Sequence, residues 1–266
     1  MGGIDREKVK GSFHRQAKTY DQYARVQKRV VANLLDQVRK EVGTPGRILD
    51  VGCGTGKLLA ELHRLHPEAQ LFGADLALGM CITAGAHLAA GAFVTADAES
   101  LPFIDGAFNL VTSTSTYQWL PALDHAFAEA RRVLAPGGIF LFALFGERTL
   151  FELKDAHYQA LKREGEVEDI THRFFPPSRV EAALAGAGFD QWRVESTLEV
   201  ELHADVPALL KSLKKIGAGN ASPRASAGLY GRKRMLAMMD IYQEKYGTTD
   251  GIPATYEVIY GAGRCP

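Results

Sequence analysis

The residues with the clearest chemical potential lie between positions 50 and 56, where Asp50 is followed by glycines at positions 52, 54 and 56. An apolar run precedes them at 47–51, and a helical pattern rich in leucine starts at Lys57. Glycine permits positive φ and has no Cβ, so such a turn lets a small molecule lie directly against the backbone. The stretch therefore predicts a site for a nucleotide-like cofactor between a strand and a helix.

The spacing of these glycines selects the cofactor. A dinucleotide-binding loop, G-x-G-x-x-G, would require glycine at position 57, which is lysine. The observed pattern D-x-G-x-G-x-G resembles motif I of the class I S-adenosylmethionine (SAM) methyltransferases. The resemblance implies that Asp50 faces the methionine end of SAM and that the loop Gly52 to Gly56 receives the cofactor. Cys53 is expected to be a small buried residue inside that loop.

Further acids stand at the ends of predicted strands. Strand 70–75 ends on Asp75, 19 residues after Gly56, and a carboxylate there can accept from both ribose hydroxyls. Strand 92–95 leads to Asp97, which by the same resemblance accepts from the adenine amino group. Parallel strands gather their carboxyl ends at one edge of a sheet, so these acids are expected to line one crevice. The predicted cofactor-binding residues are Asp50, Gly52, Cys53, Gly54, Gly56, Asp75, Leu76, Asp97, Ala98, Glu99 and Ser113.

The elements that must position these residues alternate between strand and helix, which predicts an α/β fold with a parallel sheet. We expect a Rossmann-like class I methyltransferase fold: a seven-stranded, mostly parallel sheet whose last strand, 255–260, is antiparallel and lies at the edge. The chain 1–266 is expected to be one domain. Three segments lie outside the minimal fold, a helical N-terminal cap at 5–41 and insertions at 147–175 and 205–250, and these are predicted to form a lid and substrate surface.

The size and charge of the chain indicate which kinds of binding partner to expect. The 266 residues, 46% of them hydrophobic, are enough to bury a full core. Lysine plus arginine and aspartate plus glutamate balance at 31 each, so no overall basic character argues for nucleic acid. Residues 1–46 and 203–266 nevertheless carry net charges of +5 and +4, from 10 basic against 5 acidic and 9 against 5, whereas 47–202 carries −9, from 12 against 21. Basic flanks favour an acidic partner.

The residue pattern gives little support for a secreted, a membrane-spanning or a metal-binding protein. The three cysteines form no C-x-x-C pair, which favours a reducing cytoplasm over a secreted scaffold. No apolar signal core is seen at the N-terminus, and no apolar run approaches the roughly 20 residues that span a bilayer. The eight histidines lack H-x-x-x-H spacing, so no metal site is expected. We expect a cytoplasmic protein that binds neither membrane nor nucleic acid.

Several phrases along the chain resemble one family, the malonyl-acyl-carrier-protein O-methyltransferases of biotin biosynthesis. They are S-F-x-R-x-A-x-x-Y-D at 12–21 with Gln27, the glycine loop, Y-Q-W at 117–119, R-F-F-P-P at 173–177, L-K-K-I-G at 213–217 and Y-E-V-I-Y-G at 256–261. Motif I alone indicates the superfamily, whereas the phrases in the insertions are more discriminating. The resemblance implies SAM-dependent methylation of the free carboxylate of a malonyl group on acyl carrier protein, which is acidic.

This chemistry asks for positioning rather than proton transfer, because a malonyl carboxylate is already ionised near neutral pH. We therefore predict no general base. The substrate carboxylate still needs a cationic or hydrogen-bonding anchor. The expected substrate-binding residues are Tyr20, Gln118, Trp119, Arg173 and Lys214.

Two alternatives remain open at this stage. Another SAM methyltransferase could act on a different small carboxylic acid or on a quinone-type carbon, although a carbon acceptor needs a base and no histidine or aspartate stands obviously after the fourth strand. A catalytically silent SAM-binding protein could use its basic flanks for docking. The sequence also leaves open whether the carrier-protein or the coenzyme A thioester is the acceptor, and whether the chain self-associates.

Overall fold

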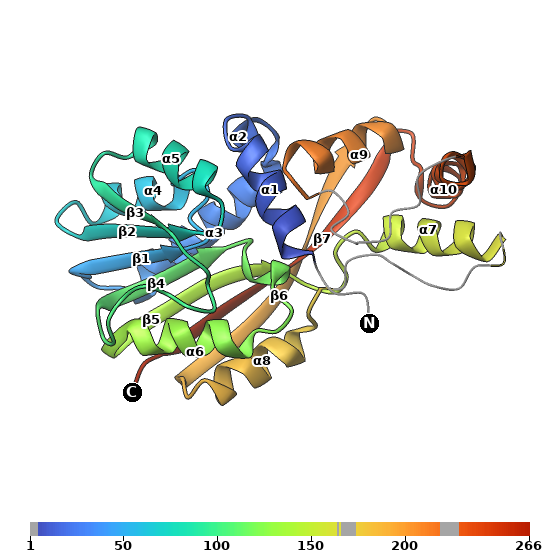
Figure 1. Ribbon diagram of the computed structural model, residues 1–266. Helices are drawn as coiled ribbons and strands as arrows, with labels where there is room; N and C mark the ends of the chain where they lie inside the picture. Colours follow the sequence, from blue (N-terminus) through green and yellow to red (C-terminus); the bar gives the residue numbers. More distant parts are fainter. Residues whose placement is uncertain (1–4, 164, 166–173, 219–228) are drawn as a thin grey trace.

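A central sheet organises the molecule, shown by a computed structural model that describes residues 5–163, 165, 174–218 and 229–266 (Figure 1). Its seven strands lie in the order β3-β2-β1-β4-β5-β7-β6, and β7 runs antiparallel to both neighbours. The strands are β1 Arg47–Val51, β2 Gln70–Asp75, β3 Gly91–Thr95, β4 Phe108–Thr114, β5 Leu134–Phe145, β6 Asp190–His203 and β7 Ile252–Arg264. The predicted fold class is confirmed.

Helices cover both faces of the sheet because successive strand residues point to opposite sides. In β1, Ile48 packs into the core beneath α3 and α4, whereas Leu49 packs into the core beneath α6 and α8. The helices are α1 Arg6–Gln16, α2 Tyr20–Tyr23, α3 Arg25–Glu41, α4 Lys57–Leu65, α5 Leu78–His87, the 3-10 turn η1 Tyr117–Trp119, α6 Asp124–Val133, α7 Phe151–Arg163, α8 Pro177–Gly186, α9 Val206–Lys215 and α10 Leu229–Tyr246.

The last strand corrects one expectation. β7 lies between β5 and β6, so the prediction that it forms the edge of the sheet is wrong. The physical reason is that consecutive residues of β7 are buried, as Val258, Ile259 and Tyr260 show. Such continuous burial is expected of a strand that is covered on both faces and paired on both sides. The edge position belongs to β6, where Leu198, Val200 and Leu202 remain exposed.

The segments outside the minimal fold gather around the carboxyl ends of the strands and beyond β7. Figure 1 shows α1 and α2 above the sheet, between α5 and α9. α7 and α10 pack together farther along, where the Lys245 ammonium pairs with the Asp155 carboxylate at 2.8 Å and the rings of Phe151 and Tyr246 lie 6.0 Å apart. The two insertions thus meet each other, and α9 touches the cap.

Two kinds of feature are absent from the described residues, a membrane-spanning helix and a cluster of metal ligands. None of the helices in these ranges combines the length and apolar character needed to cross a bilayer. Likewise, the described histidine, cysteine and acidic side chains form no group of three or more arranged to hold a metal ion.

Candidate active site

A cavity opens where the carboxyl ends of β1 to β4 meet the cap. Its floor comes from Val51, Gly52 and Gly54 after β1, from Asp75 and Leu76 after β2, and from Asp97 and Ala98 after β3. Thr114, Ser115 and Thr116 follow β4 and close one side. The empty volume is about 780 Å³, open solvent at the mouth included.

The glycine loop has the conformation that its sequence predicted. Gly52, Gly54 and Gly56 have φ of +70°, +52° and +81°, in the left-handed region that favours glycine. A Cβ on Gly52 would lie 2.0 Å from the Thr116 hydroxyl oxygen, whereas a Cβ on Gly54 would meet none of the described atoms within 4 Å and would project into the cavity. The loop therefore offers bare backbone to a ligand.

Asp75 fixes this loop. One carboxylate oxygen accepts from the Gly54 amide at 3.0 Å, and the other accepts from the Ala77 amide at 2.8 Å. Each oxygen has a second lone pair, so the carboxylate can still accept from a bound diol. Burial raises the pKa of Asp75 to about 6, although the two amide donors oppose that rise.

This pKa predicts a pH-dependent affinity for SAM. The sequence predicts that Asp75 accepts from the ribose hydroxyls of SAM; only the ionised carboxylate could do so at both oxygens, and a proton on it would compete with the cofactor. Because the pKa is raised rather than depressed, the competition falls near pH 6, and apparent affinity should be about tenfold weaker at about pH 5 than at about pH 7. Calorimetric titration across this range measures it. Asp75→Asn should bind more weakly and without the transition near pH 6, and a transition that persists in this variant would assign it to another group.

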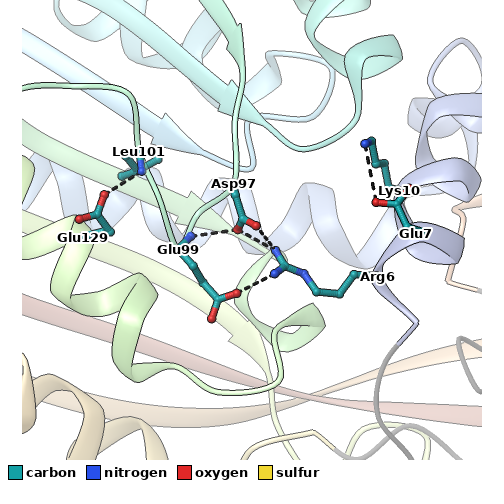
Figure 2. A network of polar contacts seen from close by, with 7 residues as sticks. All are labelled: Arg6, Glu7, Lys10, Asp97, Glu99, Leu101 and Glu129. Atoms are coloured by element: carbon teal, nitrogen blue, oxygen red, sulfur yellow. Dashed lines mark hydrogen bonds and ion pairs between the residues drawn. The ribbon is translucent and has the colours of Figure 1, made fainter.

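A second network lies at the other end of the cavity and ties the cap to the strand ends (Figure 2). The Arg6 guanidinium, at the start of α1, donates to both oxygens of the Asp97 carboxylate, at 2.6 and 2.7 Å, and to Glu99 at 2.7 Å. Asp97 and Arg6 line the cavity, whereas Glu99, a predicted cofactor-binding residue, does not. The loop after β3 and the first turn of the cap are therefore joined by charge.

Aromatic side chains of the cap and of η1 enclose the middle of the cavity. Phe13 lies edge-on to Trp119, with ring centroids 5.8 Å apart, and tilted against Tyr20 at 6.2 Å. All three line the cavity. Burial and the nearby charge of Asp21 raise the pKa of the Tyr20 phenol, so its hydroxyl stays protonated and can donate a hydrogen bond. Tyr20 and Trp119, two of the predicted substrate-binding residues, thus line the cavity.

Other predicted site residues take different positions. Asp50 is buried beneath the loop, where it accepts from the Thr112 hydroxyl at 3.0 Å and where burial raises its pKa to about 8. Ser113 is also buried and donates to the Val51 carbonyl at 2.7 Å. Neither lines the cavity, and their side chains join β4 to β1. Their neighbours Ser115 and Thr116 face it instead.

The predicted substrate anchors are only partly brought together. Gln118 is buried and donates its amide to the Ser115 carbonyl at 2.7 Å, which supports a residue held at φ +56°. Lys214 is exposed on α9 and does not line the cavity. Arg173 lies outside the described residues.

A second, larger cavity adjoins the first and extends between α3 and α4. Tyr20, Gly52, Gly54, Thr114 and Ser115 line both cavities, so the two meet above the glycine loop. Cys53 and Gly56 line only the second one. Asp21 closes the near end by accepting from the Thr55 hydroxyl at 3.0 Å. The cap is thus tied to both ends of the crevice.

Sequence reasoning missed several lining residues. Arg6, Val9 and Lys10 carry no motif, and only the folded cap brings them over the strand ends. Phe13 lies within the phrase at 12–21 that resembles the family, but the phrase indicates no role for this side chain. Ser115 followed β4 directly, and its position at a strand end was the one signal that could have indicated it.

Comparison with known proteins agrees with this geometry. A family model described as a methyltransferase domain matches residues 49–142, which hold most of β1, all of β2 to β4, the glycine loop and both cavity acids. Among solved structures, the YcgJ protein from Bacillus subtilis superposes with a TM-score of 0.60 at 19% identity, covering 87% of this chain and 97% of that one. At that identity the likeness shows the fold.

The curated relatives match over nearly the whole chain. Malonyl-[acyl-carrier protein] O-methyltransferase from Geobacter sulfurreducens is 53% identical over 98% of this chain and 99% of its own length. The enzyme of the same name from Hahella chejuensis is 38% identical over 97% of this chain and 90% of its own. The resemblance seen in the sequence phrases is confirmed. This chain is a methyltransferase and belongs to the malonyl-[acyl-carrier protein] O-methyltransferase family.

Proposed function

We propose that this chain transfers the methyl group of SAM to the free carboxylate of a malonyl thioester carried on acyl carrier protein. The ester masks a negative charge, so the product can serve as the primer for pimeloyl and biotin synthesis. The observation that carries the proposal is the 53% identity to the Geobacter enzyme over nearly the full length of both chains. That match includes the cap and the insertions, the parts of this fold outside the common sheet.

The described residues fit SAM at the carboxyl ends of β1 to β4. Gly54 leaves room at the backbone, Asp75 keeps lone pairs for ribose hydroxyls, and Asp97 would accept from the adenine amino group. The residues that both cavities share, above the glycine loop, would then hold the methyl-bearing end of SAM. When bound, SAM supplies a methyl group activated by the positive sulfonium.

The protein's own part is to position the acceptor and to exclude water. An ionised carboxylate attacks without losing a proton, so the transfer needs no general base. Among the described residues that line the first cavity there is no histidine, and both carboxylates there, Asp75 and Asp97, already accept hydrogen bonds. The aromatic enclosure of Phe13, Tyr20 and Trp119 shields the reacting atoms from bulk water.

The acceptor carboxylate needs an anchor, and Tyr20 is the predicted residue that the structure places at the junction of the cavities. Arg173 and Lys214 remain proposed cationic anchors. Lys10 adds a cation at the cavity wall, where its ammonium lies 3.8 Å from the Glu7 carboxylate. Gln118 acts on the acceptor through Ser115, whose carbonyl it holds.

The acyl carrier protein would dock on the basic surface of the helical insertions. Lys211 and Lys214 are exposed on α9, and Arg232 and Lys233 are exposed on α10, which packs against α9. Arg234 turns inward and is buried. We take the chain as one domain with a cap at 5–41 and lid segments at 147–175 and 205–250, acting in the cytoplasm where SAM and carrier proteins meet.

A panel of acceptors tests the function. Intact-mass spectrometry with SAM should find one added methyl group on malonyl-carrier protein, and none on the unloaded carrier or on an acetyl-loaded one that lacks the carboxylate. Methylation of other small carboxylic acids in preference to the malonyl thioester would support the broader methyltransferase alternative. SAM binding without turnover on any acceptor would support the silent binding protein.

Salt should separate the two possible malonyl thioesters. At about 0.05 M salt we expect kcat/KM for malonyl-carrier protein to exceed that for malonyl-coenzyme A by about tenfold, because charge complementarity steers a protein partner. The advantage should shrink at about 0.5 M salt, where the Debye length falls to a few ångströms. Lys233→Glu should lower the carrier-protein value alone, with the coenzyme A thioester as internal control. Equal salt responses for both thioesters would contradict docking on the basic helices.

A further inference from the structure

Arg6 occupies an unusual place for a residue of an N-terminal helix, because its guanidinium reaches the acid that the cofactor's adenine would meet. It lines the cavity beside Asp97 and spans two carboxylates at once, Asp97 and Glu99 (Figure 2). The side chains of Arg6 and Asp97 are about one-third exposed, 29% and 32%. This is a network at the rim of the site and not a buried structural pair.

The hydrogen bonds to Asp97 leave a defined vacancy for a donor. Among the described residues, its Oδ1 accepts from Arg6 Nη2 and from the Glu99 amide at 3.0 Å, whereas Oδ2 accepts from Arg6 Nη2 alone. An ionised carboxylate offers about four acceptor positions. One position on Oδ2 therefore remains for the adenine amino group while Arg6 stays in place.

Arg6 also supplies what the loop after β3 lacks on its cap side. The far end of that loop is fixed by Glu129, which accepts from the Leu101 amide at 2.7 Å, and by Arg132, which donates to the Leu101 carbonyl at 2.9 Å. At the near end, Asp97 and Glu99 carry like charges that repel each other. The Glu99 amide holds one oxygen of Asp97, and the Arg6 guanidinium, paired with both carboxylates, offsets their repulsion and fixes the second oxygen.

We propose that Arg6 is a positioning residue for cofactor recognition: it holds the Asp97 carboxylate in the orientation that accepts the adenine amino group. The inference rests on the proposed use of SAM and adds a determinant of purine specificity from outside the methyltransferase core. Its consequence is selective, because a ligand without the amino group gains nothing from an oriented Asp97.

The test compares two ligands by isothermal titration calorimetry: S-adenosylhomocysteine, and its inosine analogue, which has a carbonyl in place of the amino group. Arg6→Ala should weaken binding of the adenine ligand about fivefold, the size expected for a partly exposed charge pair, and leave the inosine ligand nearly unchanged. Arg6→Lys should recover part of the discrimination, since lysine keeps the charge but not the planar fork. Arg15→Ala removes an exposed arginine from the same helix and should change neither affinity.

The outcomes separate this inference from the function on which it rests. Equal weakening of both ligands in Arg6→Ala, or no change in either, would overturn the positioning role while leaving SAM binding intact. No discrimination between the ligands by the unaltered protein would overturn it as well. Failure of the unaltered protein to bind the adenine ligand at all would instead overturn the proposed cofactor. Circular dichroism of each variant confirms that it is folded.

Discussion

Gly54→Ala should leave the protein folded but weaken SAM binding roughly 100-fold, as expected when a side chain is forced into space that a ligand must fill. The added methyl group would meet no described atom of the protein within 4 Å, so it does not disturb packing. It would instead project into the cavity from the loop that is proposed to receive the cofactor. Calorimetry of SAM binding, together with thermal unfolding, measures both effects.

Gly137→Ala is the matched control for this substitution. Gly137 also has a positive φ, +72°, and a Cβ there would likewise meet no described atom within 4 Å, but the residue lies in β5 between the paired residues Leu134 and Ile139 and lines neither cavity. Both variants should lose about 1–2 kcal/mol of folding free energy from left-handed strain. If Gly54→Ala binds SAM as well as the control does, the cofactor does not lie against this loop.

Asp75→Ala should weaken SAM binding by roughly 100-fold or more, because each hydrogen bond to a charged acceptor contributes about 1.5–3 kcal/mol and two ribose hydroxyls are served. The substitution also removes the acceptor of the Gly54 and Ala77 amides, which loosens the loop that carries the cofactor. Asp75→Asn keeps one acceptor oxygen, so its affinity for SAM should fall between those of the unaltered protein and Asp75→Ala. Binding of SAM and of S-adenosylhomocysteine should weaken in parallel, since both carry the same ribose.

The control for Asp75 is an aspartate that does not line the cavity. Asp105 precedes β4, is largely exposed and pairs with Arg132 at 2.7 Å. Asp105→Ala should leave the affinity for SAM unchanged. A similar loss in both variants would point to a general effect of charge, and an undiminished affinity in Asp75→Ala would remove the ribose contact from the proposal.

The sequence was most informative where backbone geometry demands a residue type. The positive φ at positions 52, 54 and 56 could be predicted because three glycines follow a strand directly and glycine tolerates the left-handed conformation. The place of Asp75 in the cavity could be predicted from its position at the end of the next strand. Spacing alone could not tell which neighbouring side chains point outward. Asp50 and Ser113 lie in the correct elements, yet their side chains face the interior between β1 and β4.

The features that the sequence did not predict depend on contacts between distant parts of the chain. The local sequence of a final antiparallel strand does not say which strands lie beside it, so an edge position for β7 is the simple expectation. Its burial along nearly the whole strand is instead that of a strand inside the sheet. Arg6 carries no motif, and its role depends on a contact with Asp97 across 91 positions of the chain. Such contacts depend on how the cap folds over the strand ends, which periodicity does not describe.

The most direct test of the central claim is where the methyl group goes. The protein would be incubated with malonyl-carrier protein and SAM labelled with carbon-13 in its methyl group, and the product examined by carbon-13 nuclear magnetic resonance. We predict a single O-methyl ester signal that disappears on mild alkaline hydrolysis with release of labelled methanol. A signal from a methyl group on carbon, or label attached to the carrier protein without its malonyl group, would contradict methylation of the malonyl carboxylate.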